Sequence, residues 1–423
     1  MRKIFAAFLS GALVSGAAFA ASPAQPKPAE VLNAYSDLAQ AMYEDSFITA
    51  KLLQAAVNAF LADPTVAKLI AARNAWKAAR IPYLQTEGFR FGNAVVDEWE
   101  GEVNSWPLDE GLIDYVAPAY GKTSDENPLY TLNVIANKQI RVGAKQLNAS
   151  VIDKNLLRQL QHAQGVEANV ATGYHAIEFL LWGQDLHGTG PGAGERPASD
   201  YALKSCTHDN CDRRAQYLKA VTDLLVDDMA KMTANWAPDG KARKDLAAKG
   251  QDGGLSTILT GIGSLSYGEM AGERMKLGLI LHDPEEEQDC FSDNTHNSHY
   301  YDELGINEIW RGRYTRVNGA VVQGPSFRDY VAAKNPEIAK RMDEKLADAF
   351  AKIKAIKDMG DSGKMAYDQM IAKGNAVGNK LVQDAIDAMV AQTRADEAVV
   401  AALGLKISLA GSNRLDNLPS VAR

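Results

Sequence analysis

The chain has 423 residues, of which 46% are hydrophobic and 23% are charged, and its formal net charge is −8. This composition is typical of a globular protein and argues against a disordered or membrane-embedded chain. The acidic balance argues against a nucleic-acid-binding function, and the length is sufficient for two domains of ordinary size.

Residues 1–20 have the features of a secretory signal peptide. A positive start at Arg2 and Lys3 precedes the apolar run of residues 4–14, and a small residue, Ala20, ends the segment where cleavage is expected. Such a run is too short to be a permanent membrane anchor, and no later stretch reaches the roughly 18 unbroken apolar residues that a spanning helix needs. We therefore expect an exported protein.

Two helices are expected in the first part of the chain. An apolar stripe with helical period covers residues 31–42. A second helix carries, at helical spacing along one face, Trp76, Arg80, Tyr83 and Glu87. This face can be the wall of a polar pocket, in which Arg80 binds a carboxylate and Glu87 is a metal ligand or a base. An internal Arg80–Glu87 pair that ties helices together explains the pattern equally well.

The stretch ATGYHAIEFLLWG, residues 171–183, predicts a third helix that contains an unusual pair. His175 and Glu178 lie at the edge of its apolar face, so an imidazole nitrogen and a carboxylate can converge on one point. Gly173 is expected to leave open space beside them. The pair suits a divalent transition metal such as iron or zinc. The two side chains can also simply hydrogen-bond to each other, and a two-residue motif alone favours that simpler interpretation.

Two loose segments interrupt the helical pattern. Residues 183–200 are rich in Gly and Pro, and residues 236–254 form a second Gly-containing stretch. We place a domain boundary near the end of the first segment. The expected domains are an N-terminal helical bundle over residues 28–205 and a C-terminal helical bundle over residues 206–415.

The three cysteines divide into a close pair and a single residue. Cys206 and Cys211 are close enough in the sequence to form a local disulfide in the oxidising compartment expected of an exported protein. A metal loop that includes His208 is the alternative, but two thiols in one short loop supply only half of a zinc site. Cys290 is expected to be a buried or semi-buried free thiol.

The C-terminal half continues the helical pattern. Asn335 and Pro336 predict the start of a long helix whose apolar face extends to Ile356, and another apolar stripe begins at Leu381. Alternation with period two, the signal of a strand, is almost absent along the chain. The expected fold class is therefore all-α, built from two helical bundles. Similar patterns in GYHAIEFLLWG and GINEIWRG suggest an internal duplication.

Several motifs resemble those of one known family. GYHAIEFLLWG resembles the G-x-H-x-x-E motif of the imelysin family, with Gly173, His175 and Glu178 at its fixed positions. AWKAARIPYLQTEGFRFG, SWPLDEGLIDYV and CFSDNTH resemble the iron-regulated protein A branch, so the resemblance extends over nearly the whole mature chain. It implies two duplicated helical bundles with a site at their interface, export to the periplasm or outer membrane, and a link to iron acquisition. Some members of the family are classed as metallopeptidases.

The residues favour binding over catalysis. A catalytic zinc needs about three protein ligands, an open position and a nearby base. His175 and Glu178 supply two ligands, Glu87 is the candidate for the third, and no obvious base then remains. We therefore predict an exported, iron-linked binding protein that holds a divalent metal, iron or zinc, at the bundle interface. An imelysin-type metallopeptidase is the alternative.

A small molecule or a peptide is a further candidate for the bound partner. In that case Arg80 would bind its carboxylate, and the pocket wall would include Trp76, Tyr83 and Gly173. A membrane-associated iron-uptake protein is the macromolecular partner that the resemblance suggests, and no nucleic acid is expected.

Overall fold

The computed structural model describes residues 25–125 and 127–409, so the predicted signal peptide at residues 1–20 lies outside the described part of the chain. The described ranges are mainly helical, and their strands form two short hairpins, which confirms the predicted all-α fold class. None of the helices in these ranges is both long enough and apolar enough to span a bilayer.

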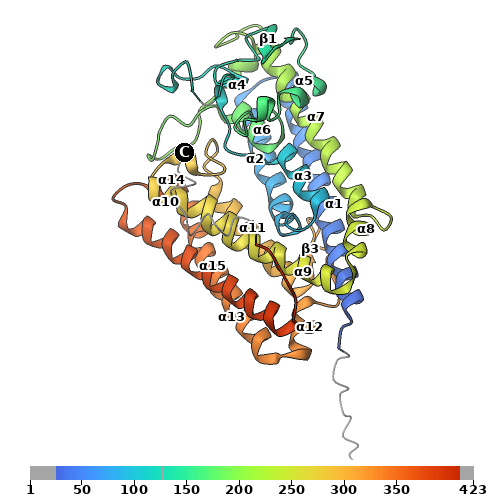
Figure 1. Ribbon diagram of the computed structural model, residues 1–423. Coiled ribbons are helices and arrows are strands. Elements are labelled where there is room, and N and C mark those ends of the chain that lie inside the picture. The colour runs from blue at the N-terminus through green and yellow to red at the C-terminus, as the bar shows by residue number, and fades with distance from the viewer. Residues whose placement is uncertain (1–24, 126, 410–423) are drawn as a thin grey trace, which may run out of the picture.

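The first part of the chain is arranged around the long helix α1 (Figure 1). Pro28 begins α1; proline is well suited to the first position of a helix, because its backbone has no N–H group and the N–H at that position has no partner within the helix. Thr65 caps the next helix by accepting a hydrogen bond from the Lys68 backbone. The elements of this part are α1 (Pro28–Ala62), α2 (Val66–Leu84), η1 (Glu87–Phe89), α3 (Ala94–Val103), α4 (Glu110–Ile113), η2 (Pro118–Tyr120), β1 (Gln139–Val142), β2 (Lys145–Asn148), α5 (Lys154–Leu160), η3 (Ala163–Gly165), α6 (Gly173–Trp182) and η4 (Ala198–Tyr201).

In the second part of the chain, the long helices α13 and α15 pack along each other. The Asn335 side chain accepts a hydrogen bond of 3.2 Å from the Ile338 backbone, which confirms the predicted helix start at Pro336. The elements are α7 (Cys211–Trp236), α8 (Lys241–Ala248), α9 (Gly250–Gly263), the π-helical η5 (Ser264–Lys276), α10 (Leu277–Leu281), η6 (Pro284–Glu286), α11 (Thr295–Arg311), β3 (Arg313–Thr315), β4 (Val321–Gln323), α12 (Phe327–Lys334), α13 (Pro336–Asp361), α14 (Tyr367–Ile371) and α15 (Ala376–Leu403).

The packing of α7 differs from the division near residue 205 that the sequence suggests. α7 lies along α1 and also contacts α5 and α6, so it packs with the N-terminal helices. Arg158 of α5 adds an ion pair to Asp228 of α7. α9 then contacts both α1 and α15 and connects the two helical groups. The Gly- and Pro-rich loop marks a break in secondary structure, whereas the apolar face of α7 determines which helices it joins.

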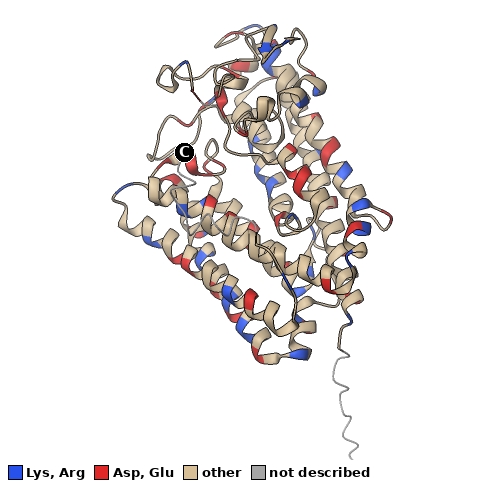
Figure 2. Ribbon diagram, viewed as in Figure 1, with Lys and Arg blue, Asp and Glu red and all other residues tan. Residues whose placement is uncertain are grey.

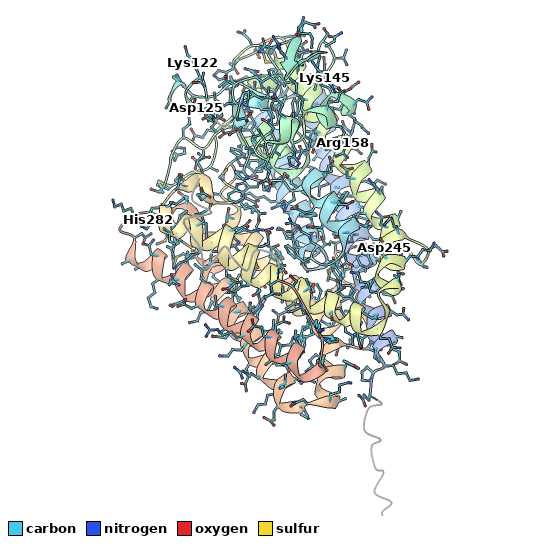
Figure 3. The ribbon with its side chains drawn as sticks, viewed as in Figure 1. Lys122, Asp125, Lys145, Arg158, Asp245 and His282 are labelled. Atoms are coloured by element: carbon cyan, nitrogen blue, oxygen red, sulfur yellow. A yellow bond between two sulfur atoms is a disulfide. The ribbon has the colours of Figure 1, made fainter. Side chains whose placement is uncertain are left out.

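The apolar core is continuous across the two helical groups. One cluster of buried apolar side chains extends from Val31 in α1 to Val399 in α15. The surface carries both signs of charge, interspersed along α13 and α15 (Figure 2). Exposed side chains such as Lys145 on β2 and Asp245 on α8 project outward from the periphery (Figure 3).

A buried carboxylate on α1 holds the hairpin formed by β3 and β4. The two strands are antiparallel, with Tyr314 opposite Val322. Asp45 is only 1% exposed. Its carboxylate accepts hydrogen bonds from the Tyr314 hydroxyl (2.8 Å), from two Arg316 nitrogens (3.0 and 2.8 Å) and from the Val317 backbone (2.9 Å). This one side chain therefore joins a C-terminal hairpin to the N-terminal helix.

We expect the Asp45→Ala substitution to lower the free energy of unfolding by about 2–4 kcal/mol, because it leaves the buried Tyr314 hydroxyl and the Val317 backbone N–H without their acceptor and removes one of the two carboxylates that pair with Arg316. Urea denaturation of the purified protein measures this loss. Asp37→Ala is the matched control, since Asp37 is on the same helix, its side chain is 59% exposed, and it pairs with Arg243; that change should cost about 0–1 kcal/mol. Equal effects of the two substitutions would contradict the role assigned to Asp45.

Candidate metal centre

The helix that carries the candidate pair, α6, begins with a glycine that has a structural role. Gly173 has φ +82°, a conformation that disfavours side chains, and a Cβ atom placed there would lie 2.3 Å from the Val103 carbonyl oxygen. The expectation of open space beside Gly173 is therefore wrong. The glycine allows the start of α6 to approach the end of α3 closely, and all residues of α6 are buried.

Three ligand-type side chains converge at α6. His175 Nδ1 lies 3.0 Å from Glu178 Oε2 and 3.8 Å from Asp289 Oδ1. One atom from each of the three residues lies within 4.8 Å of the other two. All three side chains are almost fully buried. Asp289 comes from the segment between η6 and α11, so the cluster joins α6 to a segment far along the sequence.

Asp289 was missed by the sequence interpretation. It lies in the acidic run HDPEEEQDCFSDNTH, which begins at His282, and most of such a run is usually solvated loop. In the structure, however, Glu287 and Asp289 within this run are fully buried. The apolar residues Cys290 and Phe291 beside Asp289, and the CFSDNTH motif that begins at Cys290, were the signals that part of this run faces the interior.

Several donors fix the Asp289 carboxylate. Arg80 Nη2 donates to Oδ1 at 2.9 Å, and Asn294 Nδ2 donates to Oδ2 at 3.0 Å. The Ser298 hydroxyl also donates to Oδ2, and the Asp289 backbone N–H donates to Thr295 Oγ1 at 2.9 Å. The carboxylate is thus oriented by charge and by hydrogen bonds before any ligand binds.

The two carboxylate oxygens of Glu178 face different partners, the His175 imidazole and the segment that precedes α11. Its Oε1 accepts hydrogen bonds from the backbone N–H and the hydroxyl of Ser292, at 3.0 and 2.6 Å, while Oε2 faces His175. His175 Nε2 is buried and has no hydrogen-bond partner among the described residues. Glu178 therefore ties α6 to the same segment that supplies Asp289.

Burial and the neighbouring charges shift the pKa values of His175, Glu178 and Asp289 in different directions. Burial, together with the Arg80 charge, lowers the pKa of His175 to about 3, so its imidazole is neutral near pH 7. Burial and the Asp289 charge raise the pKa of Glu178 well above its usual value. Burial acts on Asp289 in the same direction, but the Arg80 charge and the hydrogen bonds from Ser298 and Asn294 together hold the pKa of Asp289 below its usual value. Asp289 is therefore the carboxylate that stays ionised.

Aromatic rings enclose the Arg80 guanidinium. Its central carbon lies 5.6 Å from the Trp76 ring, 5.7 Å from the Tyr83 ring and 5.2 Å from the Tyr174 ring. Trp76 Nε1 also donates to the Tyr174 carbonyl at 2.9 Å. Arg80 Nη1 donates to Asn104 Oδ1 at 2.5 Å. Trp76 and Tyr83 thus pack around an arginine that is committed to Asp289.

Glu87 belongs to a different group of charges. α2 ends at Leu84, and Glu87 begins η1 after a turn, so the helical spacing that relates it to Arg80 in the sequence does not continue. Its Oε2 accepts a hydrogen bond of 2.8 Å from Arg274, which also pairs with Asp302 at 2.9 Å. The structure therefore does not bring Glu87 to the His175–Glu178 pair, nor does it form an Arg80–Glu87 pair.

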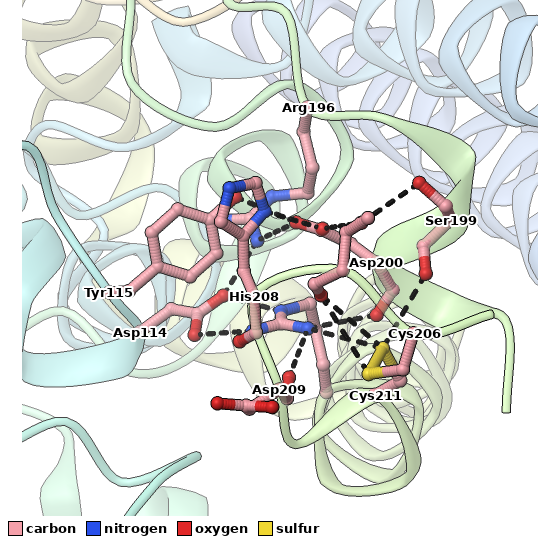
Figure 4. The surroundings of a disulfide bond; sticks show 11 residues. Asp114, Tyr115, Arg196, Ser199, Asp200, Cys206, His208, Asp209 and Cys211 are labelled. Carbon is pink, nitrogen blue, oxygen red and sulfur yellow. Dashed lines mark hydrogen bonds and ion pairs between the residues drawn. A yellow bond between two sulfur atoms is a disulfide. The ribbon is translucent and has the colours of Figure 1, made fainter.

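Cys206 and Cys211 are joined by a disulfide in the structure (Figure 4). Their sulfurs are bonded to each other rather than available to a metal, and His208 Nδ1 lies 2.8 Å from Asp200 Oδ1. The remaining cysteine, Cys290, is buried and free.

A cavity of about 480 Å³ lies near this disulfide, at the C-terminal end of α6. Its lining includes Trp182, Arg196 and His208, and the His208 ring stacks on Tyr115 with a centroid distance of 4.5 Å. His175 and Glu178 are not part of this lining. The cavity and the three-residue cluster therefore occupy different ends of α6.

Comparison with known proteins gives the family. Iron-regulated protein A of Synechococcus elongatus is 43% identical over 61 residues, which are 14% of this chain and only 17% of that protein's length. A crystal structure assigned as an iron-regulated protein A precursor, from Parabacteroides distasonis, has a TM-score of 0.60 at 16% identity, and the match covers 90% of this chain and 97% of that one. This likeness shows the fold. The imelysin family model matches residues 39–395, and the chain therefore belongs to the imelysin family.

Proposed function

We propose that this protein binds a divalent transition metal, iron or zinc, through His175, Glu178 and Asp289. The observation that carries the proposal is the convergence of one imidazole and two carboxylates, all buried, from two remote segments of the chain. Iron is favoured because a relative and a structural neighbour both have names that refer to iron regulation. We also propose that the protein is exported, as the features of residues 1–20 predict.

The residues present fit such a metal. Ligand atoms that lie about 2.1 Å from one metal ion are about 3.0–3.4 Å from each other. His175 Nδ1 lies 3.0 Å from Glu178 Oε2, within that range, and 3.8 Å from Asp289 Oδ1, so the Asp289 carboxylate must approach slightly when the metal binds. Nitrogen and carboxylate oxygen together suit iron and zinc. The imidazole is neutral near pH 7, as a metal ligand must be. When bound, such a metal would supply Lewis acidity.

The metallopeptidase alternative has less support from the same geometry. One oxygen of Glu178 is bound by Ser292 and the other faces His175, so this carboxylate is not free to act as a base. The three side chains are also closed off from solvent, whereas a peptide bond must reach a catalytic metal.

A second candidate function is the binding of a small molecule or peptide. The cavity of about 480 Å³ at the end of α6 favours it, because its volume and aromatic lining are in the range of small-ligand sites. Arg80 does not line this cavity and is paired with Asp289. Arg196 does line it, but its guanidinium is paired with Asp114 and Asp200, at 2.6 and 3.2 Å.

We expect purified protein to retain about one iron or zinc ion per chain after loading and dialysis. Three substitutions should each weaken metal binding at least tenfold, because each removes a ligand: His175→Ala, Glu178→Ala and Asp289→Asn. Elemental analysis measures the metal content. His187→Ala is the control for a surface histidine, since the His187 side chain is 37% exposed, and Glu87→Gln tests the ligand that the sequence suggested. Both should retain the metal. Equal metal content in all variants, or none in any, would refute the proposal.

Metal binding should become tighter as the pH rises above 4.5, the usual pKa of a glutamate side chain. In the metal-free protein the pKa of Glu178 is well above that value, so a proton must leave Glu178 before the metal binds. His175, with a pKa of about 3, does not compete. We expect affinity to increase by up to about tenfold per pH unit while Glu178 is the group that loses a proton. Titration calorimetry over a pH series measures this, and the Glu178→Gln variant should lose the dependence.

We expect the metal-loaded protein to cleave unfolded peptides weakly or not at all, because Glu178 is engaged and the cluster is closed. Mass spectrometry of the incubated peptides is the measurement. Cleavage that is present in the wild-type protein and absent in Glu178→Gln would establish the metallopeptidase alternative instead. Cleavage that is equal in both would point to a contaminating protease.

A further inference from the structure

A second group of carboxylates lies in the same region but has different neighbours. Glu287 follows η6, Asp293 precedes α11, and Asp368 belongs to α14. One oxygen from each lies within 4.8 Å of the other two. Figure 2 shows acidic ribbon segments beside α14. The group therefore brings the segment before α11 against a helix that is far along the sequence.

These carboxylates lack the partners that buried charges need. Glu287 and Asp368 are both 0% exposed, and neither oxygen of either side chain has a hydrogen-bond partner among the described residues. Burial, and then the charges of Asp368 and Asp293, raise the pKa of Glu287 well above its usual value. Lys77 is the cation whose charge acts on Asp293, but its ammonium donates to the Ser292 carbonyl at 3.1 Å. The three carboxylates thus repel one another without a neutralising ion pair.

A second, independent observation is an unpartnered hydroxyl at the same place. Tyr367 is fully buried, and its hydroxyl has no partner among the described residues. Tyr367 precedes Asp368 at the start of α14. Burial raises the pKa of Tyr367, and the Glu287 charge adds to the increase. The His299 ring packs edge-on against Tyr367 at 4.9 Å, and neither of its nitrogens has a partner in the described chain. A buried polar group without a partner costs about 1–3 kcal/mol, so several together point to a ligand.

One member of the group also borders a cavity, although Glu287 itself is 0% exposed. A small cavity reaches Glu287 and is lined by Asp185, Pro284, Glu285, Glu287, Cys290 and Phe291. Three of these lining residues are acidic, so the cavity attracts cations and repels anions.

We propose that Glu287, Asp293 and Asp368 form a second cation site, separate from the His175 cluster, that holds a hard divalent cation such as Ca²⁺. All three ligands are carboxylates, and hard cations prefer oxygen ligands, whereas transition metals favour sites that contain nitrogen or sulfur. The bound ion offsets the repulsion among the three charges and joins the 287–293 segment to α14. Asp289 and Ser292 belong to that segment, so the ion holds in place the residues that face His175 and Glu178.

The test is calorimetric titration of metal-free protein with Ca²⁺, and separately with Mg²⁺, together with thermal unfolding. We expect about one Ca²⁺ per chain and a higher Tm when Ca²⁺ is present. Asp368→Asn and Glu287→Gln should weaken binding at least tenfold. In chelator these two variants should be no less stable than the wild type, because each removes a buried, unpartnered charge.

Two controls separate this site from the transition-metal centre. His175→Ala should bind Ca²⁺ as the wild type does, even though it loses the transition metal. Asp387→Asn changes an exposed carboxylate on α15 and should also bind normally. The proposal is overturned if the wild type binds neither Ca²⁺ nor Mg²⁺, or if Asp368→Asn and Glu287→Gln both bind as the wild type does. Loss of Ca²⁺ binding in His175→Ala would show instead that the ion occupies the His175 cluster.

Discussion

The buried ion pair between Arg80 and Asp289 is the interaction on which the candidate metal centre depends. Both side chains are fully buried, and they join α2 to the segment before α11. Charges in such a place are tolerated only when paired, and removing one partner of a buried pair costs about 3–5 kcal/mol. The pair also has an electrostatic effect, because Arg80 keeps Asp289 ionised beside a neutral imidazole. This contact therefore contributes to both the position and the charge of the third ligand, together with the hydrogen bonds from Asn294 and Ser298.

Two of the buried arginines hold separate groups of carboxylates. Arg80 orients Asp289, whereas Arg274 holds Glu87 and Asp302. The separation arises from local geometry, because α2 ends before Glu87 is reached and the chain turns into η1. Rings around Arg80 keep water away from the first group. As a result, Arg80 pairs with Asp289, which is remote in the sequence, and not with Glu87, which is close to it.

Local sequence signals predicted the helices well because helix formation depends on short-range periodicity and capping. The apolar stripe of residues 31–42 and the cap at Asn335 both correspond to observed helices. The pair of His175 and Glu178 was visible for the same reason, since residues one turn apart are neighbours on any helix. Asp289 and the packing of α7 on α1 depend on contacts between distant segments. Periodicity carries no information about such contacts, so the third ligand and the grouping of α7 could not be derived.

The closure of the centre follows from the way in which its ligands are held. Ser292 binds Glu178, and Asp289 faces His175, so one segment both completes the cluster and covers it. With the three side chains at most 1% exposed, a metal ion can reach them only when that segment moves away from α6. The same segment carries Glu287 and Asp293. With the proposed cation bound, the attachment of this segment to α14 and its attachment to α6 are therefore physically linked, because moving the segment away from either one disturbs the other.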